Sequence, residues 1–178
     1  MKRKYLALIV FVMLAVMVFA ACSSGGATAS GDVKLGLGTI NRINKSKDAG
    51  EADGVAQTDA VVAAVSVDSE GKIVAVNIDT VQSAIAFTVD GKLATDPEKL
   101  VSTKKELGDD YGMKARSSLN KEWYEQIAEL EKWLVGKTVS DIDGMALTEG
   151  KPDDLKTSVT ITVTDYLAAV KKAIANAG

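Results

Sequence analysis

The feature that most constrains the fold is a long run rich in β-branched residues that is interrupted by one compact turn. Residues 61–67 read Val-Val-Ala-Ala-Val-Ser-Val, and residues 73–78 read Ile-Val-Ala-Val-Asn-Ile. Between them lie Asp68-Ser69-Glu70-Gly71, which are residue types that favour turns. The pattern predicts two strands of an antiparallel hairpin. One face of the second strand is expected to point into the core, formed by Val74, Val76 and Ile78.

Further strands are expected on either side of this hairpin. Residues 84–89 form another apolar run and predict a third strand, and the Asp90-Gly91 pair after it predicts a second hairpin turn. Before the hairpin, residues 32–52 carry a weaker alternating pattern that predicts a possible first strand. Its apolar positions are Val33, Leu35, Leu37 and Ile40.

The second half of the chain has the periodicity of helices. Asn120 can cap a helix over residues 121–135, with Gly136 as its stop, and a second helix is expected over residues 164–177. Each has one apolar face, made of Trp123, Ile127, Leu130 and Leu134 in the first and of Tyr166, Leu167, Val170, Ile174 and Ala175 in the second. We therefore expect an α+β domain in which helices pack on a small antiparallel sheet.

The chain begins with a segment of the leader type. Lys2, Arg3 and Lys4 precede an unbroken apolar run over residues 5–21, and small residues surround Cys22. A basic start, an apolar stretch and small residues before a cleavage point are typical of a secretory signal peptide. The alternative is a transmembrane anchor, for which this run is marginal, because a spanning helix needs about 20 apolar residues.

The cleavage point resembles that of a bacterial lipoprotein. Phe19-Ala20-Ala21-Cys22 is similar to the lipobox, usually Leu-Ala-Gly/Ala-Cys, with Phe19 in place of Leu. The resemblance implies that residues 1–21 are removed, that Cys22 carries acyl chains such as palmitate, and that the membrane is a partner through this lipid. It also implies a location on the outer face of the cell membrane, or in the outer membrane of a two-membrane cell. Residues 22–52 would then hold the lipidated Cys, a flexible tether over 23–31 and the possible first strand.

Composition narrows the chemistry that is open to the domain. Cys22 is the only Cys and the chain has no His, which excludes a Cys nucleophile in the domain, a Cys/His zinc site and a Ser-His-Asp triad. Removal of residues 1–21 takes three cations and no acid, and so changes the net charge from −3 to −6. An acidic chain is a poor partner for nucleic acid. The sequence assigns no residue to catalysis or to a metal. Redox chemistry would require a bound cofactor.

Two segments resemble the bacterial FMN-binding domain of extracytoplasmic electron-transfer proteins. The first is the hairpin, with Asp53-Gly54 before it and Gly71-Lys72-Ile73-Val74 at its centre. The second is residues 134–143, Leu-Val-Gly-Lys-Thr-Val-Ser-Asp-Ile-Asp, which is similar to the family's Val-Gly-Lys-Ser-x-x-Asp-Val-Asp. The resemblance covers roughly residues 53 to 177 and implies an FMN-binding-like α+β domain over 53–178.

The resemblance also implies a site for the cofactor. In the family, a Thr before the closing helix receives FMN through a phosphoester bond made by a flavin transferase, within the motif Asp-x-x-Ser/Thr-Gly-Ala-Thr. This chain has Asp154, Thr157 and Thr160 at that spacing. Thr160 is therefore the implied FMN acceptor, and Asp154 and Thr157 are the implied further cofactor-binding residues.

This chain departs from that motif at two positions. Ser158 and Val159 stand where the family has Gly and Ala, and residues 144–153 are inserted before the motif. Ser resists the positive φ that Gly adopts readily, and Val is stiff and bulky. Residues 158–163 also alternate between polar and apolar, so a plain strand is the alternative to an acceptor turn, with Val159, Ile161 and Val163 facing inward.

Other side chains are candidates for contacts with a ligand. Trp123, Tyr111 and Tyr124 could stack on a flavin ring, although core positions are the alternative for them. Glu106, Asp109 and Asp110, together with Tyr111, could line a ligand or cation site, for which solvated loop charge is the alternative.

These features lead to three functional hypotheses. The first is a lipid-anchored electron carrier with FMN, whose partners would be a flavin transferase and redox proteins. The second is a flavin-free, degenerate relative that acts as a binding or structural module at the cell surface. The third is a hydrolase with paired carboxylates, which the absence of His and of a free thiol disfavours.

Overall fold

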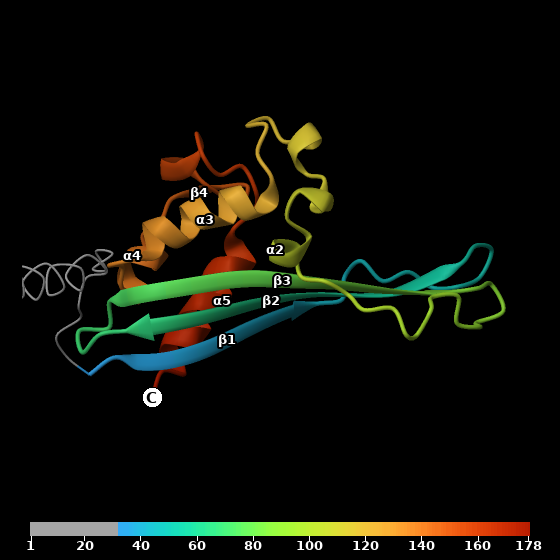
Figure 1. Cartoon of the computed structure of the whole chain (residues 1–178), viewed down its shortest axis with the longest axis horizontal. Coiled ribbons are helices and arrows are strands. Elements are labelled where there is room, and N and C mark those ends of the chain that lie inside the picture. The colour runs from blue at the N-terminus through green and yellow to red at the C-terminus, as the bar shows by residue number, and fades with distance from the viewer. Residues whose placement is uncertain (1–31) are drawn as a thin grey trace, which may run out of the picture. The chain divides into compact units, whose positions relative to one another are not determined.

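A long antiparallel hairpin forms the spine of the domain in the computed structural model, which describes residues 32–178 (Figure 1). Strand β2 (Gly54–Val67) pairs with β3 (Ile73–Phe87), and β1 (Lys34–Arg42) pairs antiparallel with the other side of β2. The expected third strand over residues 84–89 is wrong, because those residues up to Phe87 continue β3. The expected signal peptide (residues 1–21) and Cys22 lie outside the described residues.

The turn between β2 and β3 forms as predicted. The Asp68 carboxylate accepts the backbone N–H groups of Glu70 and Lys72, each at 2.9 Å, and Gly71 has φ 76°. Such side-chain caps and a residue at positive φ are what a tight turn requires. The Asp90-Gly91 turn also forms, since Gly91 has φ 75° and Leu93 bridges back to Phe87.

A register shift at the start of β3 corrects the predicted inward face. Ser66 pairs with Ala75 but Val67 pairs with Ile73, so that Val74 is an extra residue in the ladder. A bulge of this kind exchanges the faces of the residues before and after it. Ile73 is therefore buried in place of Val74. Ile78 is fully buried and Val76 packs half-buried against the core, both as predicted.

The expected first strand forms, but with its leucines outward. Gly36 and Gly38 face helix α5 (Thr164–Ala175), and a Cβ at Gly38 would lie 2.1 Å from the carbonyl oxygen of Ala169. The backbones of β1 and α5 thus approach as closely as glycine allows. Leu35 and Leu37 lie on the opposite face of the sheet, 71% and 56% exposed.

The end of α5 also covers the free edge of β1. The backbone N–H of Gly178, the Asn176 amide and the Lys172 ammonium donate to three carbonyl oxygens of that strand, those of Leu35, Leu37 and Thr39. The carbonyl groups of this edge are therefore already bonded within the domain.

The two predicted helices form and cover one face of the sheet. Helix α3 is Trp123–Leu134 and α5 is Thr164–Ala175, and their apolar faces meet the inner side chains of β2 and β3 in a single core. Helix α3 begins later than predicted: Asn120 has φ 52°, and Glu122 is the N-cap, its N–H donating to the Glu125 carboxylate at 2.7 Å. Gly136, at φ 79°, follows its end as expected.

Short elements complete the domain. They are α2 (Lys104–Leu107), η2 (Gly108–Tyr111), η3 (Lys114–Arg116), α4 (Val139–Asp143), β4 (Leu147–Thr148), β5 (Lys151–Pro152) and η4 (Asp153–Leu155). The insertion at 144–153 contains the small β4–β5 hairpin. Across residues 32–178, no helix has both the length and the apolar character that crossing a membrane requires.

Candidate functional site

The two segments that carry the family resemblance lie against each other. The backbone N–H of Gly136 donates to the Ile73 carbonyl at 2.7 Å, and the N–H of Ile73 donates to the Lys137 carbonyl at 2.9 Å. The residues after α3 therefore dock on the first residue of β3. This contact fixes the packing of α3 on the sheet and is remote from the motif around Thr160 in the chain.

The motif segment is a turn followed by irregular chain, so the plain-strand alternative is wrong. The N–H groups of Ser158 and Val159 both donate to the Leu155 carbonyl, at 2.8 and 2.7 Å. These bonds continue the turn of η4 and leave no ladder partner for residues 158–163. Val159 and Val163 are nonetheless fully buried. The alternation thus reflected burial of these two valines in the core and not strand pairing.

The implied acceptor, Thr160, is held by helix α3. Its backbone N–H and its hydroxyl both donate to the Gln126 side-chain oxygen, at 2.8 and 3.2 Å, and Gln126 is fully buried. Asp154 and Thr157 lie close together on η4 and the turn after it, and both are exposed. None of the three lines either of the two cavities described below.

Two cavities adjoin along β3. The first, of about 660 Å³, lies between β3 and the returning segment 93–102, and we call it the apolar cavity; its apolar lining includes Ile85, Leu93, Leu100, Val101, Leu107 and Tyr111. The second, of about 480 Å³, lies between the sheet and the start of α5, and we call it the basic cavity; its charged lining is Arg42, Lys45, Asp59, Lys104 and Asp165. Gln82 and Lys104 line both cavities.

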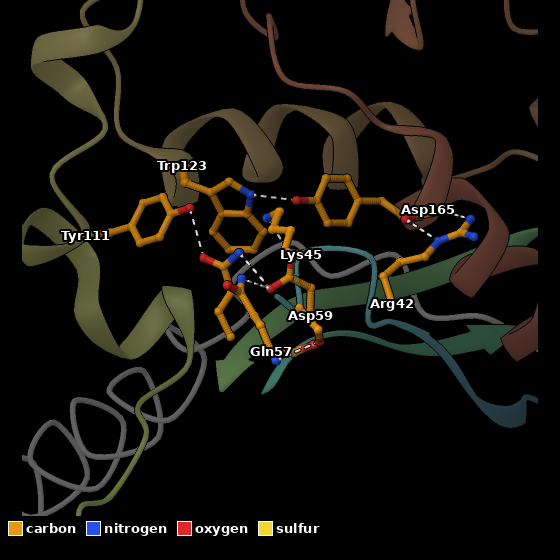
Figure 2. Close-up of polar contacts among 10 residues, drawn as sticks. Arg42, Lys45, Gln57, Asp59, Tyr111, Trp123 and Asp165 are labelled. Atoms are coloured by element: carbon orange, nitrogen blue, oxygen red, sulfur yellow. Dashed lines mark hydrogen bonds and ion pairs between the residues drawn. The ribbon is translucent and has the colours of Figure 1, made fainter. Parts of the chain in front are cut away.

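A chain of polar contacts runs between the two cavities (Figure 2). The Tyr111 hydroxyl donates to the Gln82 side-chain oxygen at 3.2 Å, and the Gln82 amide donates to Asp59 Oδ1 at 3.1 Å. Gln57 donates to the same oxygen at 2.8 Å, and Lys45 Nζ lies 2.5 Å from Asp59 Oδ2. The network fixes the wall that the two cavities share.

Asp59 is held in its charged form by this network. Burial by itself would raise the pKa of its carboxyl group, but the hydrogen bonds from Lys45, Gln57 and Gln82 and the charge of Lys45 outweigh that effect. The pKa of Asp59 therefore lies below its ordinary value. Asp59 is thus an unsuitable proton donor at neutral pH and serves to hold Lys45.

The other carboxylate of the basic cavity is also paired. Arg42 Nε and Nη2 donate to the two oxygens of Asp165 at 3.1 and 2.7 Å, which is a bidentate pair (Figure 2). Lys104 differs from Arg42 and Lys45, because no carboxylate among residues 32–178 lies within ion-pair distance of its ammonium group. Lys104 is only 8% exposed.

Aromatic rings take the place of a carboxylate around Lys104. Its ammonium nitrogen lies 4.8 Å from the centre of the Tyr111 ring and 5.2 Å from that of Trp123. Such cation–π contacts stabilise a desolvated cation. Trp123 in turn packs edge-on against Tyr166 and donates its Nε1–H to the Tyr166 hydroxyl at 3.0 Å.

The three candidates for ring stacking have different environments. Trp123 is 1% exposed and belongs to the core, whereas Tyr111 lines the apolar cavity. Tyr124 is exposed, and a hydrogen bond to Asp109 raises the pKa of its hydroxyl. Of the three, Tyr111 alone lines one of these two cavities.

The acidic candidates do not gather into a cation site. Glu106, Asp109 and Asp110 are all exposed. Glu106 accepts the N–H of Thr103, the N-cap of α2, and so completes a capping box. Over residues 32–178, no group of three or more possible metal ligands is found.

Sequence reasoning missed most of the basic cavity. Arg42, Lys45 and Asp59 lie on β1, the loop after it and β2, and Lys104 starts a four-residue helix. No spacing in the sequence links these residues, and a Lys-Lys-Glu-Leu segment is typical of solvent-exposed chain. Only pairing of the strands brings them together, so the sequence carried no signal for this site.

Comparison with known proteins gives one short similarity. No family model matches the chain, and no solved structure matches it. A protein named chlorophenol reductase, from Desulfitobacterium hafniense, is 52% identical over 40 residues. The aligned segment is 22% of this chain and 12% of that reductase, so it leaves both family and activity open.

Proposed function

We propose that this protein is a lipid-anchored extracytoplasmic electron carrier that binds FMN in the two adjoining cavities. The observation that carries the proposal is that an apolar and a cationic cavity share Gln82 and Lys104. A ligand with a planar apolar ring and an anionic end would match that arrangement. Both volumes fall within the usual range for small-molecule sites, about 300–1,000 Å³.

The contacts favour reversible over covalent binding. The Thr160 hydroxyl is bonded to buried Gln126 and lines neither cavity. A transferase would have to break that bond and displace the segment from α3. The chain's own residues fit a non-covalent flavin better, with Tyr111 on one wall of the apolar cavity and Lys104 between the two cavities. FMN would supply the electron transfer, and the protein would supply position and electrostatics.

Anchoring and location are part of the same proposal. Cys22 and the residues before it resemble a lipoprotein signal. A lipid on Cys22 would hold the domain at the outer face of the cell membrane, or at the outer membrane of a two-membrane cell. Electrophoretic mobility and intact mass of the protein from cells, with and without Cys22→Ser, test this part.

Titration of the full chain with FMN in a neutral detergent tests the flavin. We expect saturable quenching of flavin fluorescence, because a ring beside Tyr111 would lose its emission by stacking. Tyr111→Leu should weaken binding by about two- to tenfold, in line with the roughly 0.5–1.5 kcal/mol of one aromatic contact. The matched control is Tyr124→Leu, on an exposed site outside both cavities. Equal loss in both variants, or no quenching by the parent chain, would contradict the proposal.

Co-expression with a flavin transferase tests covalent attachment separately. We expect the intact mass to lack an FMN phosphoryl adduct. An adduct that disappears in Thr160→Ala would show that the family's covalent mode operates here despite Ser158 and Val159.

The second candidate is a flavin-free binding module. The departures at Ser158 and Val159 and the engaged Thr160 hydroxyl favour it. It would give a colourless protein with neither adduct nor FMN binding, even when transferase is present.

A further inference from the structure

Three buried residues that line the basic cavity carry hydrogen-bond donors for which residues 32–178 supply no acceptor. Thr80 is 2% exposed, and its hydroxyl has no hydrogen-bond partner. Tyr166, 8% exposed, accepts from Trp123 through its hydroxyl oxygen and so retains its own proton to donate. Lys104 contributes an ammonium group that is paired with aromatic faces alone. All three residues line the same cavity.

The charge of the cavity is unbalanced by one positive group. Arg42 is matched by Asp165, and Lys45 is matched by Asp59. Lys104 is the charge that remains. Burial of the unpaired Thr80 hydroxyl is costly unless something compensates. A cation on a mostly buried side chain is likewise disfavoured when no counter-ion lies beside it. An anion with several acceptor oxygens would compensate all three donors together.

We propose that the basic cavity is a binding site for a phosphate-type oxyanion, held by Lys104, Thr80 and Tyr166. The donor set supports this class of ligand, because the residues that carry one charged donor and two hydroxyl donors, from β3, α2 and α5, line the same cavity. Charge-assisted hydrogen bonds to such an anion are the strong kind. The anion is either free phosphate or the phosphate end of a larger ligand, and the site requires no flavin.

Calorimetric titration of the full chain in neutral detergent with inorganic phosphate, at constant ionic strength, tests the proposal. We expect saturable binding that weakens about tenfold or more in Lys104→Met, which keeps the aliphatic stem and removes the charge. The matched control is Lys92→Met, at an exposed turn outside both cavities, which makes the same change in net charge. Binding that is absent in the parent chain, or equal in the two variants, would overturn the proposal.

Thr80→Val provides a second variant that does not depend on Lys104. Removal of a buried hydroxyl that has no partner should leave the melting temperature of the free protein unchanged or raise it. The same variant should weaken phosphate binding about fivefold, since one hydrogen bond to the anion is lost. A lower melting temperature with unchanged phosphate affinity would show that the hydroxyl has only a structural role, and would overturn its place in the site.

Competition identifies the source of the anion and separates this inference from the flavin proposal. If the phosphate end of FMN occupies the site, FMN displaces phosphate and riboflavin does not. If phosphate binds and FMN does not, the flavin proposal fails and the oxyanion site stands. A third outcome is that FMN binds without displacing phosphate and that Lys104→Met leaves the affinity for FMN unchanged. The basic cavity would then not hold the phosphate end of FMN, and the titration with inorganic phosphate would decide whether the oxyanion site exists.

Discussion

At the level of single residues, Gly36 and Gly38 set how closely β1 approaches α5. A Cβ at Gly36 would lie 1.9 Å from the Ala173 carbonyl oxygen, and a Cβ at Gly38 would lie 2.1 Å from that of Ala169. Both neighbours are backbone atoms, which cannot move without shifting the helix. Close packing of β1 on α5 therefore requires glycine at these two positions.

Gly38→Ala should destabilise the domain by about 1–3 kcal/mol, because the added methyl forces β1 and α5 apart. Urea unfolding followed by circular dichroism measures the change. Gly50→Ala is the control, since a Cβ there meets nothing within 4 Å. A stability loss in the control as large as that of Gly38→Ala would mean that close packing is not the cause.

Asp59→Asn tests the network between the cavities. Because the folded-state pKa of Asp59 is depressed, its contribution to stability is present above the pKa of the unfolded chain and is lost as pH falls through the folded value. The variant should lose on the order of 1 kcal/mol at pH 7. The difference from the parent chain should shrink below about pH 4. A stability difference that is constant from pH 7 to pH 3 would contradict this assignment.

At the level of elements, the periodicity of the sequence predicted which helices and strands form but not where each one ends. The helices at 123–134 and 164–175 and the turn at Asp68 follow from local patterns, and all three form. The length of β3 did not follow, because the sequence shows two apolar runs and only pairing with all of β2 makes them one strand. Ile73 is buried instead of Val74 because of a β-bulge, and the alternation of polar and apolar residues in the sequence does not reveal a bulge.

The candidate site was the least predictable part for the same reason. Thr160 was singled out through a motif, and in the structure it is bonded to Gln126, which is 34 residues away along the chain. Lys104 and Thr80 belong to no motif and are adjacent only because segment 103–107 follows the edge of β3, where Val81 bridges to Thr103. Long-range contacts of this kind cannot be read from a local pattern.

Gln126→Leu should reveal the dependence of segment 159–163 on helix α3. The substitution leaves the Thr160 N–H without its acceptor and should cost about 1–3 kcal/mol. Thr160→Val removes only the hydroxyl bond, keeps the N–H bond and should cost less. Unfolding in urea gives both values, and a larger loss for Thr160→Val than for Gln126→Leu would refute the anchoring role of the amide.

At the level of the whole described domain, the sheet extends beyond the hydrophobic core. The buried hydrophobic residues of β2 begin at Val61, whereas the strand begins at Gly54. The hairpin therefore runs on past the helices as an arm (Figure 1). Along this arm residues 54–60 pair with 81–87, where burial is partial. The apolar cavity lies beside the arm and so adjoins its less buried part.

Amide hydrogen exchange should divide the hairpin into two parts. Residues 61–67 and 73–80 are packed against the helices and should exchange only through global unfolding, whereas 54–60 and 81–87 should exchange faster through local opening. Mass spectrometry of peptides from the two halves measures this. We expect a ligand in the apolar cavity to slow exchange in 81–87. Uniform protection along both strands would rule out an independently opening arm.

The hydrogen bonds from residues 176–178 to β1 have a consequence for solubility. An open strand edge is a template on which a second molecule can add its own strand and begin a fibril. Here the outermost strand also carries two exposed leucines, which would make such growth favourable. Asn176 and Gly178 donate to two of that strand's carbonyl oxygens. A second molecule's strand would have to displace these two bonds before it could pair along that edge.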